Sequence, residues 1–324
     1  MINHNTIKGI SLGLAATFIW GMFYPLSRLL FGYEEDSVEP LNFSALRFIL
    51  AALVMAPVLF KRENRIKAVE MVRTEWKVLL LLGLVGMVGE GVLVFWSIKY
   101  TTASRSSLMA NTSPITTFLI SWLIGREACT RGKFAGMVIG FAGVLVLFLC
   151  KGEDMFAQNA SMLTGDLMAF ASGICWAIFT VYGDKVSNKY GGLLCTEVLF
   201  LIAVAIVVPA AIIWNGGLNL ALSARAWTGA LYLGALSYGL AEGLWYMALK
   251  YVTPGELGAL GYVSAALAVT SSVLLLHEKV TIYLSVAIVL IVIGVGLMLR
   301  RSEAESKEVI SKLAQNALRD GHSG

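Results

Sequence analysis

Charged residues are scarce in this chain of 324 residues. Asp, Glu, Lys and Arg together make up 14% of it, against about 25% in an ordinary soluble domain. Apolar residues reach 57%, and the mean hydropathy is +0.75. One soluble core cannot bury so much apolar surface, so lipid must cover a large part of it. The scarcity of charge therefore excludes a soluble globular domain.

Histidine is equally rare, and the three histidines, His4, His277 and His322, lie near the chain ends or at the end of an apolar segment. No Ser–His pair or HExxH motif can be built from them. The four cysteines show no CxxC spacing, which argues against a disulfide framework or a metal cluster. Asp166 and Asp184 would lie about 27 Å apart on one helix, too far for an aspartyl dyad. Because no phosphate-binding loop is present either, we expect no enzyme, no metal and no cofactor.

Ten apolar segments are long enough to cross a bilayer, whose core of about 30 Å needs roughly 20 helical residues. The first is too long for a cleaved signal peptide, so we expect it to be retained. The sequence predicts an all-α membrane protein with ten transmembrane helices. The expected helices are 9–31, 41–60, 78–98, 103–124, 133–150, 165–186, 192–214, 227–249, 254–276 and 281–299.

The distribution of Lys and Arg favours one orientation, because basic residues gather in the cytoplasmic connections. With the N-terminus inside, the inner connections carry most of these residues, and both termini are predicted to be cytoplasmic. The outer connections hold only Arg28, Lys99, Arg105, Lys151, Arg225 and Lys279.

Two polar segments lie outside the expected helices. Residues 61–77 carry Ile66, Val69, Val72 and Trp76 at helical spacing. This pattern predicts an amphipathic turn or two at the membrane surface. The tail, residues 302–324, is polar with one weak apolar face, so we expect a frayed cytoplasmic helix and keep a partner-binding site as the alternative.

The two halves of the chain resemble each other. Lys99-Tyr100 corresponds to Lys250-Tyr251, and Glu127 corresponds to Glu278, both at a separation of 151 residues. Glu90 corresponds to Glu242 with a slip of one residue. Such self-similarity indicates a repeat, with residues 1–152 as the first half and 160–301 as the second. Because each half holds five helices, the second half enters the membrane from the opposite face, as in the inverted repeats of many secondary transporters.

Several short motifs carry a resemblance to a known family, and their order and spacing matter more than any one of them. They are Trp20-Gly21, Arg47-Phe48, Lys99-Tyr100, Pro114, Gly125-Arg126-Glu127 and the glycines Gly136, Gly140 and Gly143. The chain resembles the ten-helix EamA-type members of the drug/metabolite transporter superfamily.

The resemblance covers nearly the whole chain and has two departures. In the second half, Glu197 lies near the position that corresponds to Arg47, and Ala265 lies at the position that corresponds to Pro114. The resemblance implies an exporter or permease of small metabolites, often amino acids, in the inner membrane of a prokaryote. It does not fix the substrate.

Four ionisable residues fall inside the expected helices, namely Arg47, Glu90, Glu197 and Glu242. Each costs roughly 2.5–3.5 kcal/mol to insert at a helix centre, so each needs a reason. Of the three acids, only Glu90 lies at a depth in the membrane similar to that of Arg47. We therefore expect an ion pair between these two residues. Glu90 and Glu242 are the leading candidates to bind a substrate amine or a proton, and a structural role is the alternative for each.

Aromatic and amide side chains complete the candidate site. Tyr238, Glu242 and Trp245 share one helical face, and Asn111 precedes Pro114, which disturbs helix 4 at mid-membrane. For any single aromatic residue, packing is the alternative to substrate binding. The further candidates for substrate or proton binding are Trp20, Tyr24, Trp176 and Tyr262.

These observations predict a secondary transporter that exports small neutral or zwitterionic metabolites by alternating access. A non-transporting scaffold or regulator, or a permease for another solute class, is the alternative. The expected partners are a small-molecule substrate, the lipid bilayer and protons as candidate coupling ions, and a homodimer stays open. No basic segment is interleaved with aromatic residues, so nucleic acid is not expected.

Overall fold

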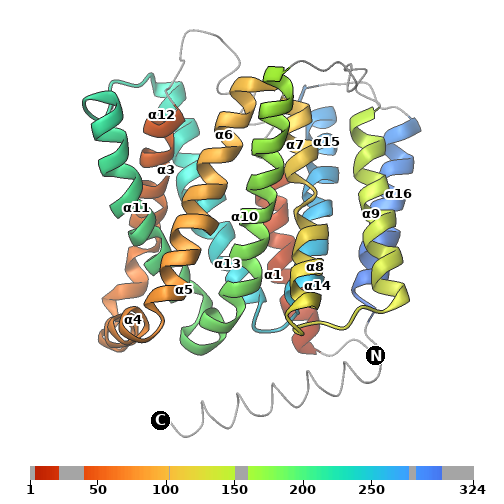
Figure 1. The fold of residues 1–324 in the computed structure, drawn as a ribbon, viewed down its shortest axis with the longest axis horizontal. Helices are drawn as coiled ribbons and strands as arrows, with labels where there is room; N and C mark the ends of the chain where they lie inside the picture. The colour runs from red at the N-terminus through yellow and green to blue at the C-terminus, as the bar shows by residue number, and fades with distance from the viewer. Residues whose placement is uncertain (1–3, 22–39, 102, 150–159, 277–281, 301–324) are drawn as a thin grey trace, which may run out of the picture.

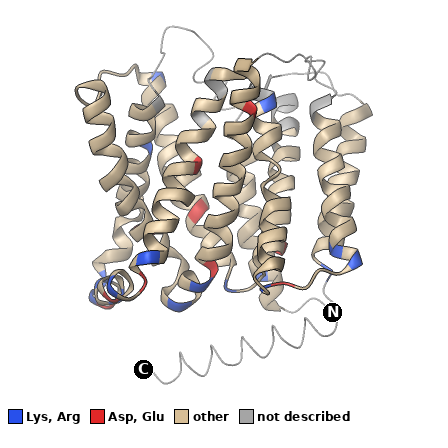
Figure 2. Cartoon of the chain, viewed as in Figure 1, with Lys and Arg blue, Asp and Glu red and all other residues tan. Residues whose placement is uncertain are grey.

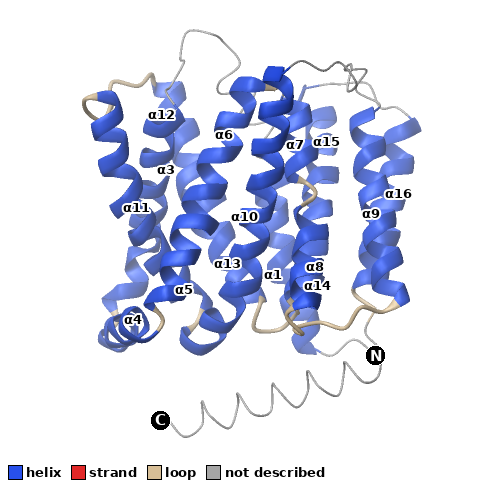
Figure 3. Cartoon of the chain, viewed as in Figure 1, coloured by secondary structure: helices blue, strands red, loops and turns tan. Residues whose placement is uncertain are grey.

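The computed structural model describes residues 4–21, 40–101, 103–149, 160–276 and 282–300. Within these ranges every regular element is a helix, and Figure 3 shows no strand there. The prediction of an all-helical protein is confirmed for this part of the chain. The candidate Tyr24, the repeat residue Glu278 and the tail 302–324 lie outside the described residues.

Five of the expected segments contain one uninterrupted helix each. One of these helices accommodates Pro209 in its interior. These helices are α1 His4–Gly21, α9 Arg131–Leu149, α10 Ala160–Tyr190, α11 Gly192–Asn215 and α16 Ile282–Met298.

The other five expected segments are divided into shorter elements. The first ends in a 3₁₀ turn, η2 Ala56–Phe60, that has a proline in its first turn. Before that turn lies α3 Pro40–Met55. The segments expected at 78–98 and 227–249 each consist of three elements, namely α5 Trp76–Leu81, η3 Leu82–Gly89 and α6 Glu90–Tyr100 in the first, and α12 Ala224–Leu231, η4 Tyr232–Leu240 and α13 Ala241–Ala248 in the second. The segments expected at 103–124 and 254–276 each consist of two, namely α7 Ala103–Ala110 and α8 Ser113–Leu123, and α14 Pro254–Ala259 and α15 Gly261–Leu276.

Two of these elements, η3 and η4, are π-helical and occupy corresponding places in the two halves of the chain. Glu90 follows η3 directly, and Glu242 is the second residue after η4. A π-helical stretch widens the helix and is frequent at functional sites. Both intramembrane acids therefore follow a local distortion of the backbone, which the sequence pattern did not predict.

Two further helices break in the middle. The chain between α7 and α8 turns at Asn111 and Thr112, and Pro114 lies in the first turn of α8. Proline lacks the N–H that would have bonded the carbonyl of Ala110, so the helix cannot continue unchanged. The corresponding break, at Leu260 between α14 and α15, has no proline within it. The predicted disturbance at Pro114 is present.

Helices from the two halves interleave. α10 packs against α6, α7 and α8, α11 packs against α3, and α1 packs against α13 and α15. Figure 1 shows α9 and α16 side by side at one edge of the bundle. These two helices correspond to the expected segments 133–150 and 281–299, the last of each half. The centre of the bundle is therefore built from both halves.

Glycines allow α9 and α16 to approach closely. A Cβ atom added at Gly136 would lie 2.6 Å from the carbonyl oxygen of Gly294. A Cβ atom added at Gly143 would lie 2.8 Å from Ile291 of α16, and one added at Gly140 would lie 2.7 Å from the ring of Tyr262 on α15. Gly132, one turn earlier on α9, is not part of this contact, because the only atom near a Cβ added there is Thr130 Oγ1 at 4.0 Å.

Ion pairs lie at both ends of the bundle. Near the start of α10, Asp166 pairs with Arg105 and accepts a hydrogen bond from Thr101 Oγ1 at 2.9 Å. Near its end, Asp184 pairs with Arg126. Since 18 residues of helix rise about 27 Å, the two pairs lie at opposite ends, and Figure 2 shows acidic and basic positions at both ends of the helices.

Beside the Asp184 pair, a third contact joins the two halves. Glu127 accepts from Lys133 Nζ at 2.7 Å and from the backbone N–H of Gly255, at the start of α14, at 3.0 Å. Thr253 and Glu256 cap the start of α14 reciprocally, which fixes the position of that N–H.

By length and composition alone, four described helices could each cross a membrane: Leu41–Phe60, Trp76–Val94, Ala160–Tyr190 and Gly192–Asn215. Ile282–Met298 is apolar but shorter. Several other expected spans are divided by the breaks described above or run into residues that the structure does not describe. The number of ten transmembrane helices and the cytoplasmic termini stay predictions.

Candidate functional site

A cavity of about 200 Å³ lies in the middle of the bundle. Residues of α1, α3, α6, α7, α8, α10, η4, α13 and α15 line it, whereas no lining residue comes from the described parts of α9 or α16. Eight of the residues predicted from the sequence line this cavity together: Trp20, Arg47, Glu90, Asn111, Trp176, Tyr238, Glu242 and Trp245.

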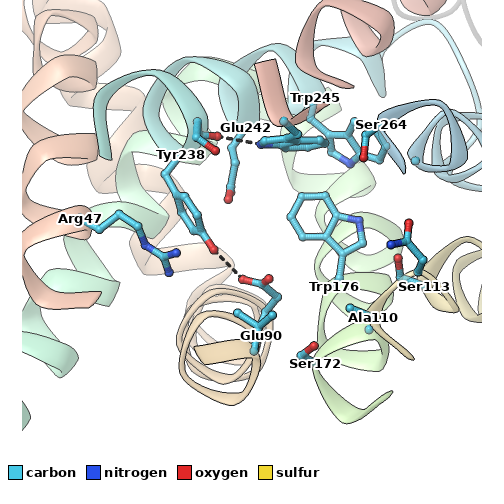
Figure 4. Close-up of a pocket in the computed structure, with 16 residues that line it drawn as sticks. Arg47, Glu90, Ala110, Ser113, Ser172, Trp176, Tyr238, Glu242, Trp245 and Ser264 are labelled. Carbon is cyan, nitrogen blue, oxygen red and sulfur yellow. Dashed lines mark hydrogen bonds between the residues drawn. The ribbon is translucent and has the colours of Figure 1, made fainter. Parts of the chain in front are cut away.

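Tyr238 lies between the two charges at one side of the cavity. Its hydroxyl donates a hydrogen bond to Glu90 Oε2 at 2.9 Å, and its ring centroid lies 3.6 Å from Arg47 Cζ. Figure 4 shows the phenol between the guanidinium and the Glu90 carboxylate. A cation over an aromatic face is stabilised electrostatically, and more strongly when water is excluded. Arg47 and Glu90 thus meet through Tyr238, and a direct ion pair between them stays a prediction.

Backbone packing fixes the place of Arg47. A Cβ atom added at Gly91 would lie 2.7 Å from a terminal nitrogen of Arg47, so the guanidinium passes closely over this glycine. Phe48 adds a second ring 5.4 Å from Arg47 Cζ. The Glu90-Gly91 pair therefore provides both an acid and the space for the arginine beside it.

Glu242 faces the same cavity but is bonded differently. Its side chain is 3% exposed, and Oε2 makes no hydrogen bond to any described residue. Figure 4 shows its carboxyl group pointing into the cavity, towards Glu90. A buried oxygen without a partner costs free energy, so it indicates a place where a proton, a water molecule or a ligand is accepted.

Three tryptophans form the opposite wall. The ring centroids of Trp20, Trp176 and Trp245 lie 5.1 to 5.6 Å from one another. Trp20 Nε1 donates to the carbonyl of Ser237 at 2.8 Å, and Trp245 Nε1 donates to Thr180 Oγ1 at 3.2 Å. Because the Nε1 atoms of Trp20 and Trp245 are engaged in these hydrogen bonds, their rings offer the cavity a mostly apolar surface. The three rings contact one another from α1, α10 and α13.

The break between α7 and α8 adds polar groups to the wall. Asn111 lies at the turn and donates to the carbonyl of Ser107 at 2.7 Å. The backbone N–H of Asn111 donates to the same carbonyl at 2.9 Å, so this carbonyl accepts two hydrogen bonds, and Asn111 is among the residues that line the cavity. Ser113 lies beside it, and Ser264 on α15 corresponds to Ser113 in the repeat.

The structure does not place every candidate in the cavity. Tyr262 is 1% exposed and packs against Gly140 of α9, outside the lining residues, and its hydroxyl has no hydrogen-bond partner in the described part of the chain. Glu197 is buried on α11 and also lies outside the lining.

Several lining residues were missed from the sequence. They include Ser172 and Gly173 on α10 and Ser264 on α15. The repeat could have indicated Ser264, because Ser113 lies 151 residues before it. Ser172 lies one helical turn before Trp176, so the shared face could have indicated it. Among the described residues, no group of three His, Cys, Asp or Glu is placed to hold a metal ion.

The described residues form a helical bundle of the membrane-protein class, with a small, partly polar cavity at its centre. The model of the EamA-like transporter family matches residues 7–149 and again residues 163–300. The chain belongs to the EamA-like transporter family. This result confirms the resemblance noted in the sequence, and it establishes a transporter role.

Individual relatives agree with this assignment. An uncharacterized transporter of Archaeoglobus fulgidus is 28% identical over 261 residues, covering 80% of this chain and 88% of its own. The uncharacterized transporter YvbV of Bacillus subtilis is 24% identical over 299 residues, covering 90% and 92%. The crystal structure of another protein matches with a TM-score of 0.75 at 22% identity, covering 89% of this chain and 95% of that chain, which supports the fold alone.

Proposed function

We propose that this chain is a secondary transporter that exports small zwitterionic or neutral metabolites, amino acids among them, by alternating access. The observation that carries the proposal is the central cavity, with Glu242 Oε2 unbonded to described residues at one side and three tryptophans at the other. A carboxylate suits a substrate amine or a coupling proton, and indole rings suit an apolar side group. Export is the direction that the family resemblance suggests.

The size of the cavity supports a small substrate. Its volume of about 200 Å³ is below the roughly 300–1,000 Å³ of sites that hold drug-sized ligands. A metabolite of a few heavy atoms beyond the amine and carboxylate fits this space better than a nucleotide or an oligosaccharide.

Alternating access needs contacts that can open at either end. The Arg105–Asp166 pair lies at one end of α10, and the Arg126–Asp184 pair lies at the other, with the cavity residue Trp176 between them. Each pair joins an element of the first half to α10 of the second. We infer that breaking one set while keeping the other opens the cavity to one side at a time.

The experiment is transport by the purified protein in vesicles, with a panel of labelled amino acids and neutral metabolites and with an imposed pH difference. Glu242→Gln keeps the shape of the side chain but removes its charge and its proton. We expect this variant to lose pH-driven accumulation while exchange down a concentration gradient is partly kept. If a well-expressed Glu242→Gln variant accumulates substrate as the native protein does, proton coupling at this residue is wrong.

Two controls separate the alternatives. Glu90→Gln alone leaves Arg47 beside a neutral group in the membrane, so the fairer comparison is the Glu90→Gln, Arg47→Gln double variant. Glu197→Gln removes a buried acid outside the cavity and should leave accumulation unchanged. If no compound of a broad panel crosses faster than in protein-free vesicles, the proposed substrate class is wrong.

A further inference from the structure

A short helix at one end of the bundle lies apart from the transport cavity. α4, Arg62–Thr74, has 13 residues and joins η2 to α5 with one residue between elements at each end. Figure 1 shows α4 almost end-on while the long helices run along the picture, so α4 lies across the bundle axis. Since it directly connects two helices long and apolar enough to cross a membrane, it lies at the level of the membrane surface.

Apolar side chains of α4 are exposed where a membrane surface would cover them. Ile66 is 60% exposed and Val69 is 52% exposed, and Trp76, just after the helix, is 54% exposed. Met71 on the opposite side is fully buried and fixes α4 against the bundle. An amphipathic helix with this distribution lies in the headgroup region with its apolar side chains towards the acyl chains.

A surface groove of about 690 Å³ runs along this helix. Arg62, Arg65 and Arg73 line it together with Ile66 and Val69. The arginines lie at spacings of three and eight residues, so they flank the apolar side chains along one side of α4. Guanidinium groups match the oxygens of a phosphate in geometry and charge.

The acids of this region are already engaged. Glu63 pairs with Lys67 at 2.6 Å, and the hydrogen bond and charge of Lys67 lower the pKa of the Glu63 carboxyl below its usual value. Glu75 accepts from Lys189 at 3.0 Å. Glu70 lines the groove as its one acid, and the Tyr190 hydroxyl lies 3.4 Å from its carboxylate.

The arginines of the groove are not engaged in this way. None of Arg62, Arg65 and Arg73 has an ion pair or a side-chain hydrogen bond within the described part of the chain, and all three are exposed. The groove therefore carries an excess of positive charge beside an apolar surface.

We propose that α4 is a binding site for an anionic phospholipid, with the headgroup phosphate at Arg62 and Arg65 and an acyl chain along Ile66 and Val69. Arg73, about 12 Å further along the helix from Arg65, adds positive charge to the same side. Charge complementarity and the adjacent apolar side chains together favour a lipid over a soluble anion. α4 also contacts the end of α10, because Thr74 Oγ1 and the Tyr190 hydroxyl lie 2.8 Å apart. The helix that would carry the lipid is therefore in contact with the helix that carries Trp176 in the cavity.

The test places the full-length protein in phosphatidylcholine vesicles that contain a minority of dibrominated phosphatidylglycerol. Bromine quenches nearby tryptophan fluorescence, and the difference between the native protein and Trp76→Phe isolates the tryptophan next to α4. We expect dibrominated phosphatidylglycerol to quench Trp76 more strongly than dibrominated phosphatidylcholine at the same fraction of the lipid does. Each arginine that contributes should raise the preference for phosphatidylglycerol over phosphatidylcholine about fivefold. Arg62→Gln, Arg65→Gln, Arg73→Gln should remove that preference.

A matched control removes the same charge elsewhere at this end of the bundle. Arg131, Lys185 and Arg300 are exposed, so changing all three to Gln should leave the preference at Trp76 unchanged. Equal quenching by both lipids in the native protein would overturn the proposal. So would an equal loss of the lipid preference in the groove variant and in the control variant. If the groove variant unfolds, Arg65→Gln alone should still lower the preference severalfold.

Two other occupants are outcomes of the same experiment. Competition by inorganic phosphate at millimolar concentration would assign the groove to a soluble anion and overturn the lipid assignment. Light scattering on the purified protein would show whether the groove variant changes the number of subunits. Such a change without a change in lipid preference would assign α4 to a contact between two copies of the chain. Transport activity is not needed for any of these measurements.

Discussion

At the scale of single residues, the phenol of Tyr238 joins the two charges of the cavity. It donates to Glu90 and stacks against Arg47, so one side chain serves both an anion and a cation. The ring and the hydroxyl act through different physical interactions, which two substitutions can separate. Phenylalanine keeps the ring and removes the hydrogen bond, whereas leucine removes both.

We expect Tyr238→Phe to lower the free energy of unfolding by about 1 kcal/mol, since a hydrogen bond within a membrane bundle contributes little more than that. Its KM for the transported substrate should rise about fivefold, because Glu90 loses the bond that positions it. Tyr238→Leu should cost about 2 kcal/mol more, because Arg47 loses its aromatic neighbour. Thermal unfolding and transport kinetics measure both quantities.

Tyr283→Phe is the matched control, because Tyr283 lies on α16 and is 55% exposed, away from the cavity. It should change neither the unfolding temperature nor KM. Identical behaviour of Tyr238→Phe and Tyr283→Phe would mean that the Tyr238 hydroxyl has no role in the site.

At the scale of elements, the contact between α9 and α16 depends on backbone atoms that meet without intervening side chains. Gly294 is its centre, since an added Cβ atom would lie 2.7 Å from the carbonyl oxygen of Gly136. Because the clash is with backbone, no side-chain rotation can relieve it. The two helices must move apart if a methyl group is introduced.

Gly294→Ala should therefore destabilise the protein by about 1–3 kcal/mol, the usual cost of overpacking a close contact. Gly296, two residues further along the same helix, provides the comparison. A Cβ atom there meets nothing within 4 Å, so Gly296→Ala should be neutral or slightly stabilising through helix propensity. Thermal unfolding of the two variants, side by side, measures the difference. Equal stability of both would show that α9 and α16 do not pack as described.

At the scale of the whole molecule, the charge inside the bundle limits the substrates. Phosphate oxygens bind clusters of Lys or Arg, whereas the cavity is lined by one arginine and two acids. That arginine already contacts Tyr238. An anion with two charges would meet net negative charge in a medium that screens it poorly.

We therefore expect sugar phosphates and nucleotide sugars to cross no faster in vesicles with the protein than in vesicles without it. The measurement is uptake of labelled compounds under the conditions in which an amino acid is transported. The neutral parent sugar serves as the control for size. Efficient transport of a sugar phosphate would contradict the expectation directly.

Much of this architecture follows from the sequence by itself. Apolar runs place the helices, because each must satisfy its backbone hydrogen bonds internally within lipid. The period of the helix assigns Tyr238, Glu242 and Trp245 to one face, and all three line the cavity. The repeat indicates Glu90 and Glu242 as corresponding acids. These features depend on the chemical type of each residue and on the spacing between residues, and both can be read from the sequence.

The tertiary structure alone decided which faces meet. Tyr262 lies in a helix next to the cavity yet packs against Gly140, whereas Ser264, two residues later, lines the cavity. The link from Arg47 through Tyr238 to Glu90 joins three helices far apart in the chain. The helical period determines which residues share a face, but the face turned inward is set by packing against neighbours that no local pattern identifies.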